Sequence, residues 1–212
     1  MSLKQKVIAI DGPSASGKGT VASRVAEALG FLYLDSGALY RLTALYAQKQ
    51  NVAWTDEDAV STLAETLPAQ FEGSVVLLNG EDVSEQIRTE AIGMGASAVA
   101  QLPKVRTALL QRQRDFLTEK GLVADGRDIG SVIFPDAALK IFLTASANVR
   151  AQRRAKQLGI PCEGVAFERI LSDIEARDEA DRRRPVAPLK QLPDALLLDT
   201  DNLSIEEAVK KV

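Results

Sequence analysis

The segment from Val7 to Thr20 constrains the fold more than any other part of the chain. Residues 7–10 are wholly apolar, which predicts a buried strand, and residues 17–29 have a helical pattern. The GPSASGKGT motif that joins them is rich in glycine, so backbone N–H groups can point inward at an anion, and the helix adds its positive N-terminal end. The segment therefore predicts a phosphate-binding loop between a strand and a helix, the alternative being an ordinary turn.

The motif fits the pattern GxxxxGK but departs from its strict form at one position. Lys18 is placed to reach the β- and γ-phosphates of a bound nucleotide. The strict pattern has Ser or Thr directly after the lysine to contact Mg²⁺, whereas this chain has Gly19 there and Thr20 next. We therefore expect Mg²⁺ to be held mostly through water and phosphate oxygens. The expected ATP-binding residues are Gly12, Pro13, Ser14, Ala15, Ser16, Gly17, Lys18, Gly19 and Thr20.

The composition excludes several kinds of chemistry. None of the 212 residues is histidine, which excludes His-based triads and His zinc sites. Cys162 is the single cysteine, so an internal disulfide is excluded. The formal net charge of −3 disfavours broad binding to nucleic acid. With no apolar run of membrane-spanning length and no secretory signal at the start, we expect a cytoplasmic protein that binds neither nucleic acid nor a membrane.

Apolar segments alternate with helical patterns along most of the chain. The expected strands after the first are residues 31–35, 122–125, 139–145 and 195–200. The expected helices after the first are residues 37–50, residues 103–118 and a last helix that Ser204 and Glu207 begin as a capping box. This alternation predicts βαβ units, so the expected fold class is α/β, with a mainly parallel β-sheet of the P-loop NTPase type flanked by helices.

Residues 51–90 break this alternation. A polar helical stretch is followed by the extended run SVVLL at residues 74–78, then by Asn79-Gly80 and by EDV. Asn-Gly between short extended runs predicts a β-hairpin. We interpret this region as a small insertion on one edge of the core, at approximately residues 39–97.

Polar residues follow two of the predicted strands. Ser36, Tyr40 and Arg41 come after the second strand, at the edge of the sheet where ligands bind in such folds. Arg41 is there either to grip an acceptor phosphate or as an ordinary surface residue of a helix. Asp125 is placed to orient water bound to Mg²⁺, as an acid that ends an apolar strand does in P-loop enzymes. Arg127 next to it belongs either to such a site or to a local ion-pair turn.

The segment from Val149 to Gly159 carries three arginines at helical spacing. Arg150, Arg153 and Arg154 are spaced i, i+3, i+4. This spacing predicts either a solvated helix face or a mobile lid, at about residues 150–163, whose arginines close on the transferring phosphoryl group.

The letters DEAD at residues 178–181 do not indicate a helicase, because they lie in a charged helical stretch rather than at a strand end. Arg177, Asp181 and Arg184 share a face of that helix, which Pro185 ends.

Six segments taken together resemble the bacterial cytidylate kinase family. They are GPSASGKGT, LDSGALYR, GEDVSEQIR, ADGRDIGSVIFPDA, FERI and RPVAPL, in this order and over nearly the whole chain. The glycine loop is shared with many kinases, whereas DSGALYR, DGRDIG and RPVAPL together are far more specific. The resemblance implies one kinase domain over residues 1–212, with an acceptor-binding insertion and a short lid, that uses ATP with Mg²⁺ to phosphorylate CMP or dCMP to CDP or dCDP. We expect the chain to be a monomer.

The same motifs imply roles for individual residues. The implied CMP site consists of Ser36, Tyr40, Arg41, Ser97, Arg106, Arg127, Asp128, Arg177, Asp181 and Arg184. Arg41, Arg127 and Arg184 would hold the acceptor phosphate, and Arg177 and Asp181 would meet the ribose. The implied catalytic residues are Lys18, Asp125, Arg127, Arg153 and Arg154.

Ser97, Arg106 and Asp128 would read the base in this resemblance. The chemistry agrees, because a carboxylate accepts a hydrogen bond from the N4 amino group of cytosine and an arginine donates to its N3 and O2. Uracil would present a carbonyl oxygen to Asp128 and would be rejected.

Three other functions remain open at this point. A kinase for UMP, AMP or shikimate would keep the loop, although the base-reading residues favour cytosine. A nonenzymatic ATP-binding regulator would need no converging arginines. A nucleic-acid-binding protein would carry a continuous basic stripe, whereas acids interleave the arginines here.

Overall fold

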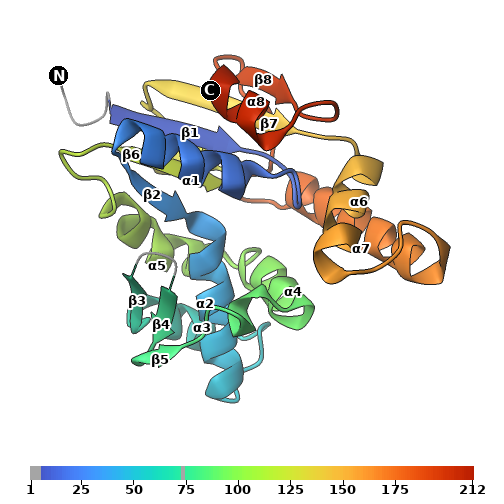
Figure 1. The fold of residues 1–212 in the computed structure, drawn as a ribbon. Coiled ribbons are helices and arrows are strands. Elements are labelled where there is room, and N and C mark those ends of the chain that lie inside the picture. The colour runs from blue at the N-terminus through green and yellow to red at the C-terminus, as the bar shows by residue number, and fades with distance from the viewer. Residues whose placement is uncertain (1–5, 73–74) are drawn as a thin grey trace. The chain divides into compact units, whose positions relative to one another are not determined.

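The structure is a computed structural model that describes residues 6–72 and 75–212 (Figure 1). Its internal contacts divide the chain into two compact units. Unit 1 is formed by Met1–Leu34 and Phe116–Val212, and unit 2 by Asp35–Asp115. The insertion predicted at residues 39–97 lies within unit 2.

Unit 1 is built on a five-stranded sheet in the order β2-β6-β1-β7-β8. The strands are β1 (Val7–Asp11), β2 (Leu32–Asp35), β6 (Leu122–Gly126), β7 (Leu139–Thr144) and β8 (Leu196–Asp199). β1 pairs in parallel with β6 and β7, and β7 pairs in parallel with β8. The register sets Asp11 beside Gly126 on one side and Phe142 on the other, so β1 and β6 end together and β7 continues two residues further. The predicted α/β class with a mainly parallel sheet is confirmed.

The helices of unit 1 are α1 (Lys18–Leu29), α6 (Ala147–Leu158), α7 (Gly164–Arg183) and α8 (Ile205–Lys211). α1 buries Val21, Ala22, Val25 and Ala26 against apolar residues of the central strands, because these four positions share one helix face. α6 and α7 pack side by side (Figure 1).

The capping box predicted for the last helix is confirmed. The Ser204 hydroxyl accepts from the Glu207 N–H at 3.2 Å, and the Glu207 carboxylate accepts from the Ser204 N–H at 2.8 Å. Local sequence alone therefore fixes where α8 begins.

Unit 2 combines helices with an antiparallel sheet in the order β3-β4-β5. Its elements are α2 (Ser36–Lys49), α3 (Glu57–Glu65), β3 (Ala69–Glu72), β4 (Val75–Leu78), β5 (Glu81–Asp82), η2 (Gln86–Arg88), α4 (Glu90–Val99) and α5 (Pro103–Arg114). α2 packs on α4, and α3 packs on α5. The predicted hairpin is confirmed, since Asn79 and Gly80 join β4 to β5 with left-handed φ values of 51° and 78°. Ser74, the first residue of the predicted SVVLL run, lies outside the described residues.

Three helical segments differ from the sequence expectations. α4 was not predicted, because its two glycines, Gly93 and Gly95, are weak helix formers. α5 ends at Arg114 rather than at residue 118. α7 begins at Gly164, ten residues before the charged stretch that predicted it, and the DEAD letters lie within it as expected.

Within residues 6–72 and 75–212, the helices are too short or too polar for any of them to cross a bilayer.

The packing of unit 2 makes Gly95→Ala informative. A Cβ at residue 95 would come within 2.6 Å of two ring carbons of Trp54, whose Nε1 donates to the Ala44 carbonyl at 2.9 Å. An alanine normally stabilises a helix relative to glycine, but here overpacking should lower the free energy of unfolding by about 1–3 kcal/mol. Urea denaturation measures this, with Met94→Ala on the exposed side of α4 as the control. A stabilised Gly95→Ala variant would contradict the packing described.

Candidate active site

The phosphate loop runs from the end of β1 to the start of α1, and its shape depends on missing side chains. The Gly12 N–H donates to the Gly126 carbonyl at 3.2 Å, and a Cβ at Gly12 would lie 2.0 Å from the Leu143 carbonyl oxygen. Ala15 and Gly17 adopt left-handed φ values of 56° and 91°. Gly17 is also the N-cap of α1 and has no side chain to occupy the N–H groups of the first turn, which suits them to bind a phosphate.

Lys18 places a positive charge over this loop. Its side chain is buried, and its Nζ donates to the Pro13 carbonyl at 3.2 Å. The Lys18 side chain thus crosses the loop from α1 toward β1. Its ammonium group lies at the loop, which is where the phosphates of a nucleotide would bind.

Three arginines, one after β6 and two on α6, donate to the same loop. Arg127 Nη2 donates to the Ser14 hydroxyl at 2.8 Å, and Arg150 Nη1 donates to the Ser14 carbonyl at 3.1 Å. Arg153 Nη1 donates to the Ser16 carbonyl at 3.1 Å. The loop is therefore flanked by positive charge although the whole chain is acidic.

Arg127 is paired with a distant carboxylate rather than with its sequence neighbours. Its Nε donates to Asp181 Oδ2 at 2.7 Å, which joins the loop after β6 to α7. Burial lowers the pKa of the Arg127 guanidinium, but the charges of Asp181, Asp125 and Asp178 outweigh burial, so its pKa is raised. Arg127 therefore remains charged, and the ion pair extends beyond a local turn.

Arg150 joins α6 to α7. Its Nη1 and Nη2 bind Asp178 of α7 in a bidentate pair at 3.0 and 2.5 Å, and its Nε donates to the Ala145 carbonyl at 2.9 Å. The side chain is buried. Of the three arginines expected on one lid face, Arg150 thus serves the α6–α7 contact, while Arg153 reaches the loop and Arg154 is half-buried on α6.

Asp128 and Arg184 lie near each other in unit 1. Arg184 Nη2 is 3.9 Å from Asp128 Oδ1, and both side chains are buried. The Arg184 Nε donates to the Ala187 carbonyl at 2.6 Å, which fixes the chain just after α7. Arg177 is half-buried on α7. Unit 1 thus brings together Arg127, Asp181, Asp128 and Arg184 through these contacts.

The remaining residues of the predicted CMP site lie in unit 2. The Arg106 guanidinium carbon lies 5.8 Å from the centre of the Tyr40 ring, a cation–π arrangement, and Arg106 Nη1 donates to the Ala100 carbonyl at 3.4 Å. Arg41 Nη1 donates to the Ile87 carbonyl at 2.9 Å. The Ser97 hydroxyl donates to the Gly93 carbonyl one turn earlier in α4, at 3.2 Å. Ser36 is buried at the start of α2.

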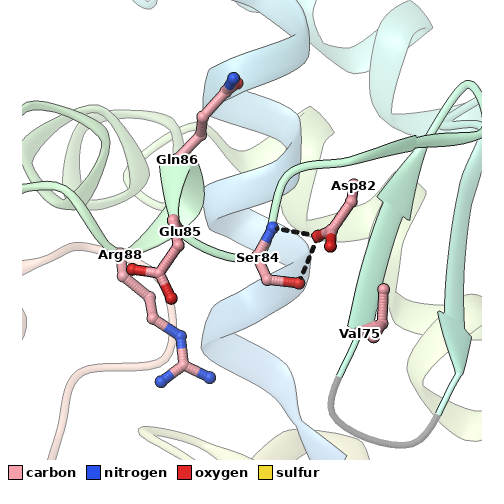
Figure 2. Close-up of a pocket in the computed structure, with 6 residues that line it drawn as sticks. All are labelled: Val75, Asp82, Ser84, Glu85, Gln86 and Arg88. Atoms are coloured by element: carbon pink, nitrogen blue, oxygen red, sulfur yellow. Dashed lines mark hydrogen bonds between the residues drawn. The ribbon is translucent and has the colours of Figure 1, made fainter.

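A hollow in unit 2 lies apart from these residues. It is lined by Val75, Asp82, Ser84, Glu85, Gln86 and Arg88 (Figure 2). Asp82 Oδ1 accepts from the Ser84 N–H at 2.9 Å and from the Ser84 hydroxyl at 2.6 Å, which fixes the turn before η2. The GEDVSEQIR segment therefore has a structural role in shaping this turn.

Asp125 lies beside the start of α1. Its side chain is buried, and Oδ1 accepts from the Tyr33 hydroxyl at 2.7 Å. The described residues contain no group of three or more His, Cys, Asp or Glu side chains that could hold a metal ion. Beside nucleotides Mg²⁺ is commonly bound by phosphates, water and one or two carboxylates, and Asp125 Oδ1, 3.8 Å from the position of a Cβ at Gly19, is a carboxylate that could take this part.

Asp11, at the end of β1, is a buried carboxylate that has none of the roles predicted from the motifs. Oδ1 and Oδ2 accept from the N–H groups of Ile129 and Gly130, each at 2.8 Å, at the start of the π-helical turn η3 (Ile129–Ile133). Burial raises the pKa of Asp11 to about 6, although these two hydrogen bonds lower it. In the sequence, Asp11 is only the residue that ends an apolar strand. Its hydrogen-bond partners, Ile129 and Gly130, are evident only from the folded structure.

The raised pKa predicts how Asp11→Asn changes stability with pH. Asp11 binds its proton more tightly in the folded chain than in the unfolded chain, where its pKa is near 3.8, so wild type loses stability as pH rises from about 4 to about 6. Relative to Asp11→Asn, this loss should reach up to about 3 kcal/mol and then stay constant at higher pH. Urea unfolding across this range measures it, with exposed Asp173→Asn as the control. A difference between wild type and Asp11→Asn that does not change with pH would rule out the raised pKa.

Comparisons with known proteins identify the family to which the chain is similar. The family model described as cytidylate kinase matches residues 8–212. A protein named cytidylate kinase from Neisseria meningitidis serogroup C is 80% identical over 209 residues, which cover 99% of this chain and 96% of that protein. Another protein of this name, from Chromobacterium violaceum, is 60% identical and covers 97% of this chain and 93% of its own length.

A solved structure of a protein from Eubacterium ventriosum has a TM-score of 0.52 at 11% identity, covering 98% of this chain and 95% of that chain. At this identity the likeness concerns the fold alone. The family model and the sequence relatives are decisive, and the chain belongs to the cytidylate kinase family.

Proposed function

We propose that this chain transfers the γ-phosphoryl group of ATP to CMP or dCMP, giving ADP and CDP or dCDP. The observation that carries the proposal is the phosphate loop with Lys18 and Arg127 in contact with it, in a chain that is 80% identical to a protein named cytidylate kinase. A kinase for another acceptor, such as UMP or AMP, is not favoured by these relatives.

In the proposed mechanism, the protein positions and neutralises phosphates rather than forming covalent bonds. ATP lies along residues 12–20, whose N–H groups and Lys18 bind the phosphates. Arg127, Arg153 and Arg154 neutralise the charge that spreads over the moving phosphoryl group. Arg127 and Arg153 already donate to the loop, which supports this role because little reorganisation is needed.

Mg²⁺ fits the loop through one carboxylate. Asp125 would hold it through water. Gly19 is at the position where the strict loop pattern has a Ser or Thr that contacts Mg²⁺, and Asp125 Oδ1 lies 3.8 Å from where a Cβ of that residue would be. When bound, the ion would neutralise charge on the β- and γ-phosphate oxygens.

We assign acceptor-binding roles to individual residues by the motifs in which they lie. Arg41, Arg127 and Arg184 bind the CMP phosphate, and Arg177 and Asp181 bind the ribose. Ser36 and Tyr40 complete the site. Base selection falls to Ser97, Arg106 and Asp128, and it is supported by the burial of Arg106 and Asp128, because hydrogen-bonding groups discriminate best when water is excluded.

The proposal includes a moving lid, a monomeric chain and a cytoplasmic location. The lid comprises residues 150–163, and closing it excludes water that would hydrolyse ATP. Arg150 and Arg153 hold the start of α6 to the loop, so the moving part would be the segment after Arg153. Light scattering with and without nucleotides tests the monomer.

The acceptor preference gives the first test. A coupled assay of ADP release, with CMP, dCMP, UMP, AMP and GMP side by side, should give fast turnover for CMP and dCMP and slow turnover for the others. In Asp128→Asn, the new amide N–H₂ can donate to the uracil carbonyl, so the ratio of kcat/KM for CMP over UMP should fall by about tenfold or more. Asp173→Asn is the control and should keep the ratio. An unchanged ratio in Asp128→Asn would remove Asp128 from base selection.

Lys18→Met gives the second test. Loss of the ammonium group should lower kcat with CMP by on the order of a hundredfold or more, because its charge is most needed in the transition state. Exposed Lys120→Met serves as the control, and circular dichroism checks that both variants fold. Wild-type turnover in Lys18→Met would remove this lysine from the mechanism.

A further inference from the structure

Tyr33, a residue of β2, reaches the part of the phosphate loop that lacks a hydroxyl group. The strict loop pattern has Ser or Thr directly after the lysine, and this chain has Gly19. A Cβ built on Gly19 would lie 3.3 Å from the Tyr33 hydroxyl oxygen and 3.8 Å from Asp125 Oδ1. The phenol oxygen is therefore close to where the missing serine or threonine side chain would begin.

The Tyr33 hydroxyl also holds Asp125. It donates to Oδ1 at 2.7 Å, a distance typical of a hydrogen bond from a hydroxyl to a charged carboxylate. The ring packs against the core cluster of unit 1, next to residues of α1 and the central strands. The half-buried ring thus holds the hydroxyl in place, and the hydroxyl has Asp125 as a polar partner.

We propose that Tyr33 is a positioning residue for Mg²⁺-dependent nucleotide binding, in which its hydroxyl replaces the hydroxyl missing at residue 19 and orients Asp125. The inference rests on the proposed function, because that function gives Asp125 its role beside the metal. Residues that orient metal-binding groups typically change metal affinity by about tenfold or more when they are altered.

A serine side chain at residue 19 and the Tyr33 hydroxyl would crowd each other. A contact of 3.3 Å to a Cβ is tight, and Tyr33 cannot retreat easily because the core and Asp125 both hold it. Serine at residue 19 should therefore disturb the site while Tyr33 is present. Removal of the phenol oxygen should make room for that serine.

The test compares wild type, Tyr33→Phe, Gly19→Ser and the double variant. Calorimetry measures the affinity for ADP with saturating Mg²⁺ and with EDTA, so the gain in affinity due to Mg²⁺ is obtained without any phosphoryl transfer. Tyr33→Phe should reduce this gain by about tenfold, with unchanged affinity in EDTA and a nearly unchanged Tm. Tyr46→Phe, a half-buried tyrosine in α2, is the matched control. The double variant should recover a larger Mg²⁺ gain than either single variant.

Several results would overturn the inference. A full Mg²⁺ gain in Tyr33→Phe would do so, as would equal losses of affinity in Mg²⁺ and in EDTA, which indicate a purely structural role. If the gain in ADP affinity due to Mg²⁺ is no larger in the double variant than in the single variants, the two hydroxyls do not substitute for each other.

Asp125→Asn separates this inference from the proposed function. If Asp125→Asn loses the Mg²⁺ gain and Tyr33→Phe keeps it, the role of Tyr33 is wrong and that of Asp125 stands. If both variants keep it, the role proposed for Asp125 fails as well. Failure of wild type to phosphorylate CMP would instead overturn the function, while the Mg²⁺ and ADP measurements would still decide the role of Tyr33.

Discussion

The close approach of three strands at Gly12 is the constraint on which unit 1 depends. No side chain fits there, because the Leu143 carbonyl lies 2.0 Å from the position of a Cβ, and the Gly12 N–H binds the Gly126 carbonyl. β1 and β6 therefore end at one level, beside β7. That common level brings the loop after β1 and the loop after β6 within hydrogen-bond distance of each other, and Asp11 then fixes the turn that follows Asp128.

Positive charge around the loop is organised without an excess of positive charge in the chain. Arg127, Arg150 and Arg153 each donate to loop atoms, and acidic partners on α7 hold the first two in place. Such preorganised donors act on developing charge without rearranging during the reaction. Asp181 orients Arg127, and Asp178 orients Arg150.

Local signals allowed much of the fold to be predicted. The apolar runs, the Asn79-Gly80 turn and the Ser204 capping box each act within a few residues, and the structure confirms them. The partners of buried charges could not be predicted, because they are distant in sequence: Asp181 is 54 residues from Arg127, and Ile129 is 118 residues from Asp11. The predicted site residues come from motifs, and their roles in binding remain predictions.

Helix α7 carries both Asp178, which binds Arg150, and Asp181, which binds Arg127. These two arginines contact the carbonyl and the hydroxyl of the same residue, Ser14. A shift of α7 would therefore change two contacts of the loop at once. In thermodynamic terms, a ligand that favours one position of α7 alters the affinity of the loop for its own ligand, and the reverse effect has the same size. The two nucleotides of the proposed reaction are thus expected to bind with mutual dependence, because α7 positions Arg127 and Arg150 at the loop.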